Sequence, residues 1–337
     1  MECRSLGSAW WTSLGVVALA MIPAAARADE VQFDTADKVE LKGTFYPGTK
    51  KSPCVILLHK LGGNRQQKGW EDLAQALNKK DYAVLSFDFR GHGDSTSVGA
   101  GFWRDRHNIM IKGAGRMAAK ISYKDFPSGY LPYLANDVAA AKRYLDQQND
   151  AGACNSSNVV VIGAEEGAAI GTLWMSTEFY RHKMTKNAFG VPVRDPSKME
   201  SDDLASAAWL SIPHKLGSYD VAYWLRGPGN KLRDKIPMVF FFGTKDSKAA
   251  AAANALFNSL KNVSSRERLS EFTRLRGKDT KLAGAELLGK KGLKTEDDIT
   301  GYLENVMQKR GLKSWVQRDP EKGPPLALVP LQYLGIR

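Results

Sequence analysis

Cysteine is rare in this sequence, and long hydrophobic runs are absent after its N-terminal segment. Three cysteines among 337 residues exclude a scaffold that is held together mainly by disulfides. No second apolar run of about 18 residues occurs, so we expect no transmembrane helix after the N-terminal segment. The spacings H-E-x-x-H, paired C-x-x-C and the EF-hand loop are also missing, and no G-x-G-x-x-G opens a helix. We therefore expect no metal ion and no cofactor.

The composition is that of a folded protein with an excess of positive charge. Hydrophobic residues make up 43% and charged residues 25%, which excludes wholesale disorder, and the formal net charge is +12. The densest basic stretch, residues 266–294, has nine basic and four acidic residues but a single aromatic, Phe272. No nucleic-acid-binding module accompanies it, so we expect no nucleic-acid partner. The charge indicates a solvated surface or a weak attraction to anionic surfaces of the cell envelope.

The N-terminal segment has the pattern of a secretory signal peptide. Arg4 precedes an apolar stretch over residues 9–22, and residues 26–28 read A-R-A, a typical cleavage pattern. We expect cleavage after Ala28 and a secreted or periplasmic protein. The alternative is an uncleaved N-terminal helix.

Apolar runs alternate with amphipathic segments through the rest of the chain. This alternation predicts an α/β fold with a mostly parallel central sheet and helices on both faces. Strands are expected at 39–46, 54–59, 82–87, 159–162, 205–212, 238–242 and 270–275, and helices at 69–78, 134–147, from about 167, 249–260 and 296–309. Three longer stretches, 97–133, 176–203 and 214–230, interrupt the pattern and form either a lid and pocket wall or surface decoration.

Four polar or glycine-rich segments each follow a predicted strand. They are His59-Lys60-Leu61-Gly62-Gly63, the D-x-R-G-x-G-x-S segment over 88–95, Gly163-Ala164-Glu165-Glu166-Gly167, and Phe242-Gly243-Thr244-Lys245-Asp246. In this order they resemble the α/β-hydrolase family, most closely its small secreted or periplasmic esterases and dienelactone-hydrolase-like members. The resemblance covers about residues 39–310. It implies one domain over 29–312, after the signal peptide of 1–28 and before a tail over 313–337.

The resemblance also implies a role for each segment. Lys60, Leu61, Gly62 and Gly63 match the loop that supplies an oxyanion-hole amide, although a plain Gly-Gly turn is the alternative. Gly163 and Gly167 match the two glycines of the nucleophile elbow G-x-S-x-G. Asp246 matches the acid of the catalytic triad, because it follows an apolar strand and a glycine.

Two of the three triad positions depart from the family pattern. The nucleophile position holds Glu165 in place of serine, and its longer side chain would overshoot the serine oxygen by roughly 1.5 Å. Misplacement of about 1 Å costs about a hundredfold in rate. No histidine follows Asp246, so Thr280 or Lys281 holds the histidine slot. We expect a hydrolase-fold protein without classical hydrolase activity. If Lys281 fills the histidine slot, an ion network of Glu165, Lys281 and Asp246 would replace the triad.

Several functions remain open at this point. The protein would bind a small ester-like, lipid or carboxylated ligand, or act as a scaffold in the cell envelope. The alternative is an active hydrolase of small esters or lactones with an unusual carboxylate centre at Glu165. Aromatic residues of the inserts would line the pocket. These are Phe102, Trp103, Tyr219, Tyr223 and Trp224.

The histidines and cysteines have structural interpretations. We expect His59 and His92 to be packed, hydrogen-bonded residues and the histidines of the inserts to be solvated. The family places the strand 54–59 beside the strand 159–162, which brings Cys54 and Cys154 to the same edge of the sheet. A disulfide between them is one alternative and two free thiols the other.

Overall fold

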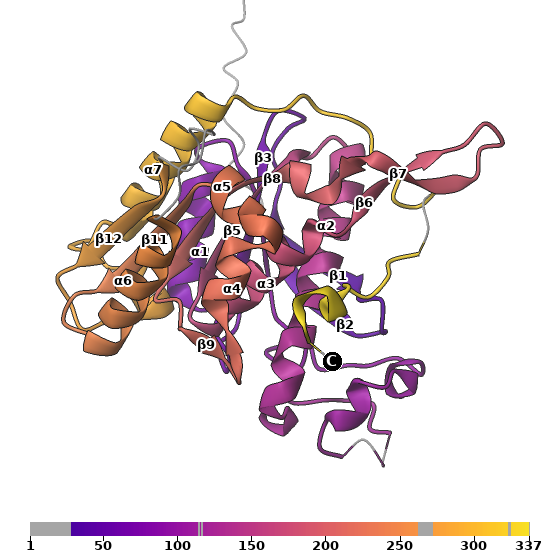
Figure 1. The fold of residues 1–337 in the computed structure, drawn as a ribbon, viewed down its shortest axis with the longest axis horizontal. Coiled ribbons are helices and arrows are strands. Elements are labelled where there is room, and N and C mark those ends of the chain that lie inside the picture. Colours follow the sequence, from indigo (N-terminus) through magenta and orange to yellow (C-terminus); the bar gives the residue numbers. More distant parts are fainter. Residues whose placement is uncertain (1–27, 114, 116, 262–271, 323–324, 337) are drawn as a thin grey trace, which may run out of the picture.

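The computed structural model describes residues 28–336 except 114, 116, 262–271 and 323–324 (Figure 1). Residues 1–27 lie outside this part, so the signal peptide remains a prediction. Among the described helices, none is long and apolar enough to cross a membrane.

An eight-stranded sheet forms the centre of the molecule, in the order β1-β2-β4-β3-β5-β8-β11-β12. Its strands are β1 (Asp29–Asp34), β2 (Glu40–Tyr46), β4 (Ala83–Phe87), β3 (Pro53–Leu58), β5 (Asn155–Ala164), β8 (Leu204–Leu210), β11 (Met238–Gly243) and β12 (Arg274–Lys278). β1 and β2 pair antiparallel, and β2 pairs antiparallel with β4. All pairs from β4 to β12 are parallel. The predicted α/β fold with a mostly parallel sheet is therefore confirmed.

Helices cover both faces of the sheet, which explains why its central strands are apolar throughout. Alternate residues of β3 enter two different cores: Ile56 packs on one side and Leu57 on the other. One face is covered by α1 (Lys68–Asn78) and α7 (Thr295–Arg310). The other face carries α2 (Ala135–Asp150), α3 (Glu166–Glu178), α4 (Val221–Arg226), α5 (Lys231–Lys235) and α6 (Ser247–Lys261).

Most expected elements occur within a few residues of their predicted positions, with three differences. The last strand is β12, Arg274–Lys278, and not 270–275. The strand β1 was not predicted, since its DEVQFD sequence is mostly exposed and paired on one side only. The region 176–203 is shorter than expected, because α3 continues to Glu178. The rest forms an antiparallel hairpin of β6 (His182–Lys186) and β7 (Pro192–Met199), which projects from the body in Figure 1.

The inserts contribute to the core as well as to the surface. Residues 97–133 form short 3-10 turns, η1 (Phe102–Arg104), η2 (Asn108–Met110), η4 (Tyr123–Asp125) and the start of η5 (Ser128–Leu134). Phe102 and Trp224 are almost fully buried in the core, so they do not line a pocket as predicted. The reason is that each insert must bury its own aromatic side chains to fold back on the domain.

The C-terminal tail runs as a strap over α2 and the start of β5. Trp315 Nε1 donates a hydrogen bond to Asn149 O at 3.0 Å, and Val329 N donates to Asn136 Oδ1 at 2.8 Å. The buried Leu331 and Ile336 anchor its last described turn, η10 (Leu331–Leu334). The tail is therefore a fixed part of the domain surface.

Candidate functional site

A sharp turn joins β5 to α3 at the predicted elbow. Glu165 occupies it with φ 48° and ψ −121°, a conformation that non-glycine residues rarely adopt. Its N–H donates to Leu210 O at 2.9 Å, which ties the turn to the neighbouring strand β8. The backbone therefore has the strained form of a nucleophile elbow, with glutamate at its tip.

The two elbow glycines permit close packing at this turn. A Cβ on Gly163 would lie 2.6 Å from Ala168 Cα, so the strand and the start of α3 leave no room for one. A Cβ on Gly167 would lie 2.6 Å from Leu58 O and still closer to His59 O. Helix α3 thereby begins directly against the end of β3, where the predicted oxyanion loop starts.

The loop after β3 is a tight turn with free amides. Gly62 has φ 77°, and Gly63 N donates to Lys60 O at 3.0 Å. Within the described chain, no acceptor receives the backbone N–H of Lys60, Leu61 or Glu166. Unpaired amides on both sides of an elbow are the donors from which an oxyanion hole is built. The oxyanion role expected for this loop stays a prediction, and the unpaired amides are compatible with it.

The Glu165 carboxylate pairs with a residue that the sequence interpretation did not consider as its partner. Lys60 Nζ lies 3.2 Å from Glu165 Oε1, and the two side chains are 34% and 28% exposed. The Glu165 side chain also packs on Gly284, where a Cβ would come within 2.9 Å of Glu165 Cγ and still closer to Oε1. Partial burial raises the pKa of Glu165, and the Lys60 ammonium opposes this shift. The pair closes the tip of the elbow.

The predicted network of Glu165, Lys281 and Asp246 is wrong. Asp246 Oδ1 accepts the backbone N–H of Lys248 and Ala249, both at 3.1 Å, and so caps the N-terminus of α6. Lys281 is exposed and forms no ion pair with a described residue. The start of α6 needs a hydrogen-bond acceptor, and Asp246 serves this role through Oδ1 and forms no ion pair with a described residue.

Thr280 also has a structural role. Its carbonyl accepts from Lys245 N at 3.0 Å, and its Oγ1 accepts from Leu282 N at 3.2 Å. The loop that carries histidine in relatives of this fold is therefore closed on itself by its own hydrogen bonds.

None of the five histidines interacts with Glu165 in the described structure. His59 donates through Nδ1 to Lys60 O at 2.7 Å, and its Nε2 accepts from Phe89 N at 3.0 Å. Burial lowers its pKa to about 3, which suits a neutral packed ring. His92 stacks on Tyr123 at 4.4 Å, so both structural predictions are confirmed. His107, expected to be solvated, is instead buried and stacks on Tyr133 at 4.4 Å.

The two cysteines are buried, free thiols, so the disulfide alternative is not realised in this structure. Cys154 Sγ donates to Leu145 O of α2 at 3.4 Å and is thereby directed to the helix. Burial and the adjacent Cys154 raise the pKa of Cys54. Within the described chain, no group of three or more His, Cys, Asp or Glu residues could hold a metal ion.

Two contributors to this site were missed in the sequence. Lys60 was assigned a role for its backbone only, and no local pattern pairs its side chain with Glu165, which is 105 residues away. No sequence motif around Gly284 indicates a role, because its contact with Glu165 arises only when the chain folds back after β12.

Replacing Glu165 by glycine is expected to stabilise the protein by about 1 kcal/mol at pH 7, because glycine adopts this backbone conformation without strain. Burial raises the pKa of Glu165 in the folded state above its value in the unfolded state. The wild type therefore loses stability as the pH rises through the folded-state pKa and Glu165 becomes charged. The gain should therefore be larger at pH 7 than at pH 4. Urea denaturation measures both values.

The matched control is Glu166→Gly, one residue further on, inside the first turn of α3. Glycine in a helix costs up to about 1 kcal/mol, so this variant should lose stability. Equal losses in both variants would contradict the strain at Glu165.

Solved hydrolase structures share this architecture. An esterase of Pyrococcus furiosus matches with a TM-score of 0.54 at 16% identity, over 83% of this chain and 91% of its own. The dienelactone hydrolase of Anabaena variabilis matches with a TM-score of 0.51 at 14% identity, over 85% and 98%. No protein-family model and no curated protein matches the sequence. From its strand order, its elbow and these structural matches, the chain has the α/β-hydrolase fold.

Proposed function

We propose that this protein is a hydrolase-fold protein of the cell envelope that has no serine-hydrolase activity and acts by binding. The observation that carries the proposal is the elbow itself: Glu165 stands at its tip and is paired with Lys60. Serine hydrolysis needs a hydroxyl, a base that takes its proton and an acid that orients the base. The side chains at these positions supply none of the three roles.

The acid position supports the proposal independently of the nucleophile. Asp246 is held by two backbone N–H groups of α6, and the loop at the histidine slot offers no ring nitrogen. His59, the histidine adjoining the elbow loop, has both ring nitrogens hydrogen-bonded within the fold. A serine substituted for Glu165 would therefore find no histidine in place to take its proton.

The envelope location rests on the N-terminal sequence. Residues 1–28 combine a basic start, an apolar stretch and an A-x-A pattern. N-terminal sequencing of the protein from its native host tests this part of the proposal. A mature chain beginning at Asp29 is expected.

A second candidate is a hydrolase with a carboxylate nucleophile. It is favoured by one observation, the unpaired amides of Lys60, Leu61 and Glu166 around a carboxylate that is 28% exposed. Such a carboxylate would displace a leaving group from an alkyl or acyl carbon, and water would then have to cleave the ester or anhydride. No histidine of the described chain contacts Glu165 to activate that water, so we rank this candidate lower.

One set of assays separates the two candidates. The purified protein is incubated with p-nitrophenyl esters, lactones and haloalkanes, and with a fluorophosphonate probe for active serines. We expect no turnover above the uncatalysed rate and no labelling. Turnover that is lost in Glu165→Gln but retained in Glu286→Gln, an exposed glutamate near the elbow, would favour the carboxylate centre.

A further inference from the structure

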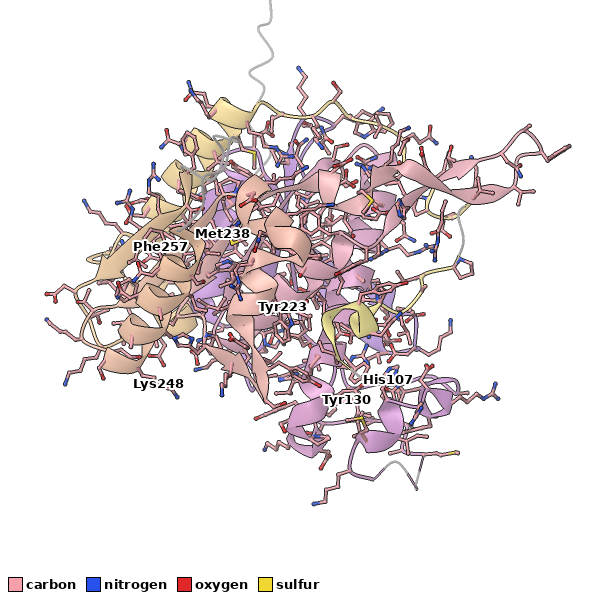
Figure 2. The ribbon with its side chains drawn as sticks, in the orientation of Figure 1. His107, Tyr130, Tyr223, Met238, Lys248 and Phe257 are labelled. Carbon is pink, nitrogen blue, oxygen red and sulfur yellow. The ribbon has the colours of Figure 1, made fainter. Side chains whose placement is uncertain are left out.

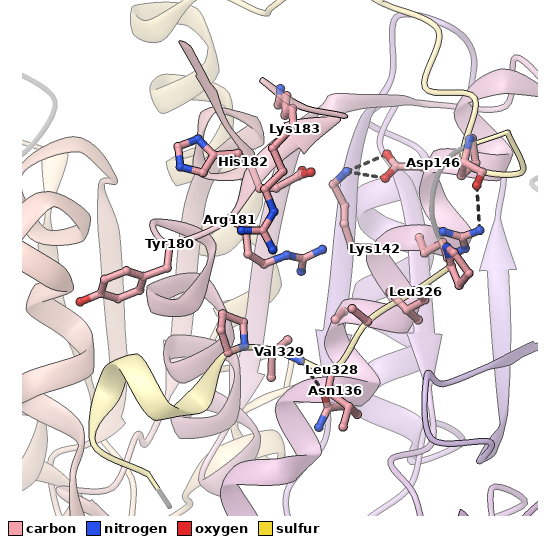
Figure 3. Close-up of a pocket in the computed structure, with 18 of the residues that line it drawn as sticks. Asn136, Lys142, Asp146, Tyr180, Arg181, His182, Lys183, Leu326, Leu328 and Val329 are labelled. Carbon is pink, nitrogen blue, oxygen red and sulfur yellow. Dashed lines mark hydrogen bonds and ion pairs between the residues drawn. The ribbon is translucent and has the colours of Figure 1, made fainter. Parts of the chain in front are cut away.

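A second site lies at the opposite end of α3 from the elbow. A cavity of about 1210 Å³ opens between α2, the hairpin β6–β7 and the C-terminal tail (Figure 3). Tyr180 and Arg181, which directly follow α3, line it. Since α3 has 13 residues, this cavity and the elbow are about 20 Å apart. The cavity is therefore distinct from the site already described.

One side of the cavity is strongly basic. The lining includes seven basic and three acidic side chains. The basic ones are Lys142, Arg143, Arg181, Lys183, Arg194, Lys198 and Arg318, and the acidic ones are Asp146, Glu200 and Asp319. Three carboxylates just outside the lining, those of Glu178, Asp195 and Asp203, pair with its cations and reduce the excess from four positive charges to one. The uncompensated charge lies at the exposed outer part of the wall, where it favours an anionic group on a ligand.

The deepest cations are held rigidly from behind. Asp203 is 1% exposed and lies 2.7 Å from Lys183 Nζ and 3.2 Å from Arg318 Nη2. Lys142 bonds both carboxylate oxygens of Asp146, at 2.7 and 2.8 Å (Figure 3). These pairs fix the basic wall in place, so a ligand meets a preorganised surface.

The outer cations are available to a ligand. Arg181 uses Nη1 for Glu178 at 2.7 Å, which leaves other N–H donors of its guanidinium. Arg194 is exposed and has no ion pair with any residue that the structure describes. Lys198 is also exposed and lies 3.6 Å from Asp195 Oδ2, a weak surface pair that leaves its ammonium accessible to a ligand. The Nδ1 atom of His182 is buried without a hydrogen-bond partner in the described chain.

The other side of the cavity is apolar and is made by the tail. Leu326, Leu328, Pro330 and Tyr333 line it, and Leu328 and Tyr333 are 36% and 52% exposed. Tyr333 also stacks on Tyr180 at 4.8 Å. Large exposed apolar side chains that face a basic wall are the features of a site for a ligand with an apolar body.

From these two walls we infer that the cavity binds an anionic amphiphile, namely an acyl chain with a carboxylate or phosphate head. The head lies against Arg181, Arg194 and Lys198, and the chain lies along the tail. The inference concerns binding only and involves no bond making or breaking. It does not depend on the elbow being inactive.

Fluorescence titration with dansyl-undecanoic acid tests the inference on the full chain. We expect saturable binding that dodecanoate and dodecyl phosphate displace, and that dodecanol displaces at least tenfold more weakly. Inorganic phosphate alone should displace the probe poorly, because it lacks the apolar body. Displacement by dodecyl phosphate but not by dodecanoate would assign the head to phosphate.

Matched variants locate the ligand. Arg194→Gln and Lys198→Gln should each raise the Kd about three- to tenfold, and Leu328→Ser should raise it similarly. Lys248→Gln, an exposed lysine at the start of α6 far from the hairpin (Figure 2), should leave the Kd unchanged. Glu165→Gln should also leave it unchanged.

Three results would overturn the inference. These are the absence of saturable binding, equal affinity for dodecanol and dodecanoate, and equal weakening by Lys248→Gln and Arg194→Gln. Loss of binding in Glu165→Gln would place the ligand at the elbow instead, which separates this inference from the proposed function.

Discussion

Replacing Arg90 by methionine is expected to destabilise the protein by about 3–5 kcal/mol, or to prevent folding, because two buried carboxylates lose their counter-charge. Arg90, Asp37 and Asp137 are each 0% exposed in their side chains. Arg90 Nη1 and Nη2 donate to Asp37 at 2.6 and 2.9 Å, and Nε donates to Asp137 at 2.7 Å. Tyr130 of the insert also accepts from Nη1 at 2.8 Å.

This cluster joins three distant parts of the chain. Asp37 follows β1, Asp137 lies in α2, and Tyr130 and His107 belong to the insert (Figure 2). A buried cation that serves all of these contacts cannot be replaced by an apolar side chain of similar length without loss of several hydrogen bonds. The effect should therefore exceed that of ordinary core substitutions.

The pH dependence gives a second measurement. In the wild type, Arg90 and its hydrogen bonds hold the pKa of Asp37 well below its usual range, against the effect of burial. This contribution to stability is present above the unfolded-state pKa and is lost only in strong acid. Without Arg90, burial would raise the pKa of Asp37, so the stability deficit of the variant should be smaller at pH 5 than at pH 8.

Arg106→Met is the control for this substitution. Arg106 is exposed in the same insert, and its replacement should change stability by less than about 0.5 kcal/mol. A loss below about 1 kcal/mol for Arg90→Met would contradict the buried network. If that variant does not fold, Tyr130→Phe removes two hydrogen bonds, the one accepted from Arg90 and the one donated to Asn108, and should cost about 1–3 kcal/mol.

Replacing Gly167 by alanine is expected to cost about 3 kcal/mol or more, at the upper end of overpacking effects. The added Cβ would meet two main-chain carbonyls at the end of β3, 2.6 Å from Leu58 O and closer still to His59 O. Backbone atoms cannot turn aside as a flexible side chain can. Relief of the clash requires α3 to shift from the sheet, which would also displace Glu165 from Lys60.

Gly301→Ala provides the contrast. Gly301 lies inside α7, and a Cβ there would have no neighbour within 4 Å. Alanine should stabilise that helix by about 0.5–1 kcal/mol. Thermal and urea denaturation measure both variants, and equal effects of the two substitutions would contradict the close packing at the elbow.

The positions of most strands along the chain and the strand-to-helix turn at Glu165 could be predicted because local patterns encode them. Continuous apolar runs mark strands that are buried on both faces, and glycines on either side of Glu165 mark a tight strand-to-helix turn. The antiparallel edge strand β1 and the hairpin β6–β7 escaped prediction. The sequences of β1 (DEVQFD) and β6 (HKMTK) are mostly polar. They show little of the alternation of apolar and polar residues from which strands are predicted.

The partners of the site residues could not be predicted, because they come from contacts between distant segments. Glu165 and Lys60 are 105 residues apart, and the packing of Gly284 on the carboxylate depends on the path after β12. The position of Asp246 in the sequence matches the triad acid of the resembled family. In the structure its carboxylate instead accepts hydrogen bonds from backbone N–H groups at the start of α6.

The sequence by itself therefore determined the α/β architecture, the elbow with glutamate at its tip and the missing histidine after Asp246. These depend on residue type and spacing along the chain. Only the tertiary structure decided that Lys60 pairs with Glu165, that Cys54 and Cys154 are free thiols, and that the tail and a hairpin enclose a basic cavity. Such features arise where separate segments meet, since charge pairing and burial are set by distances in space and not by distances in sequence.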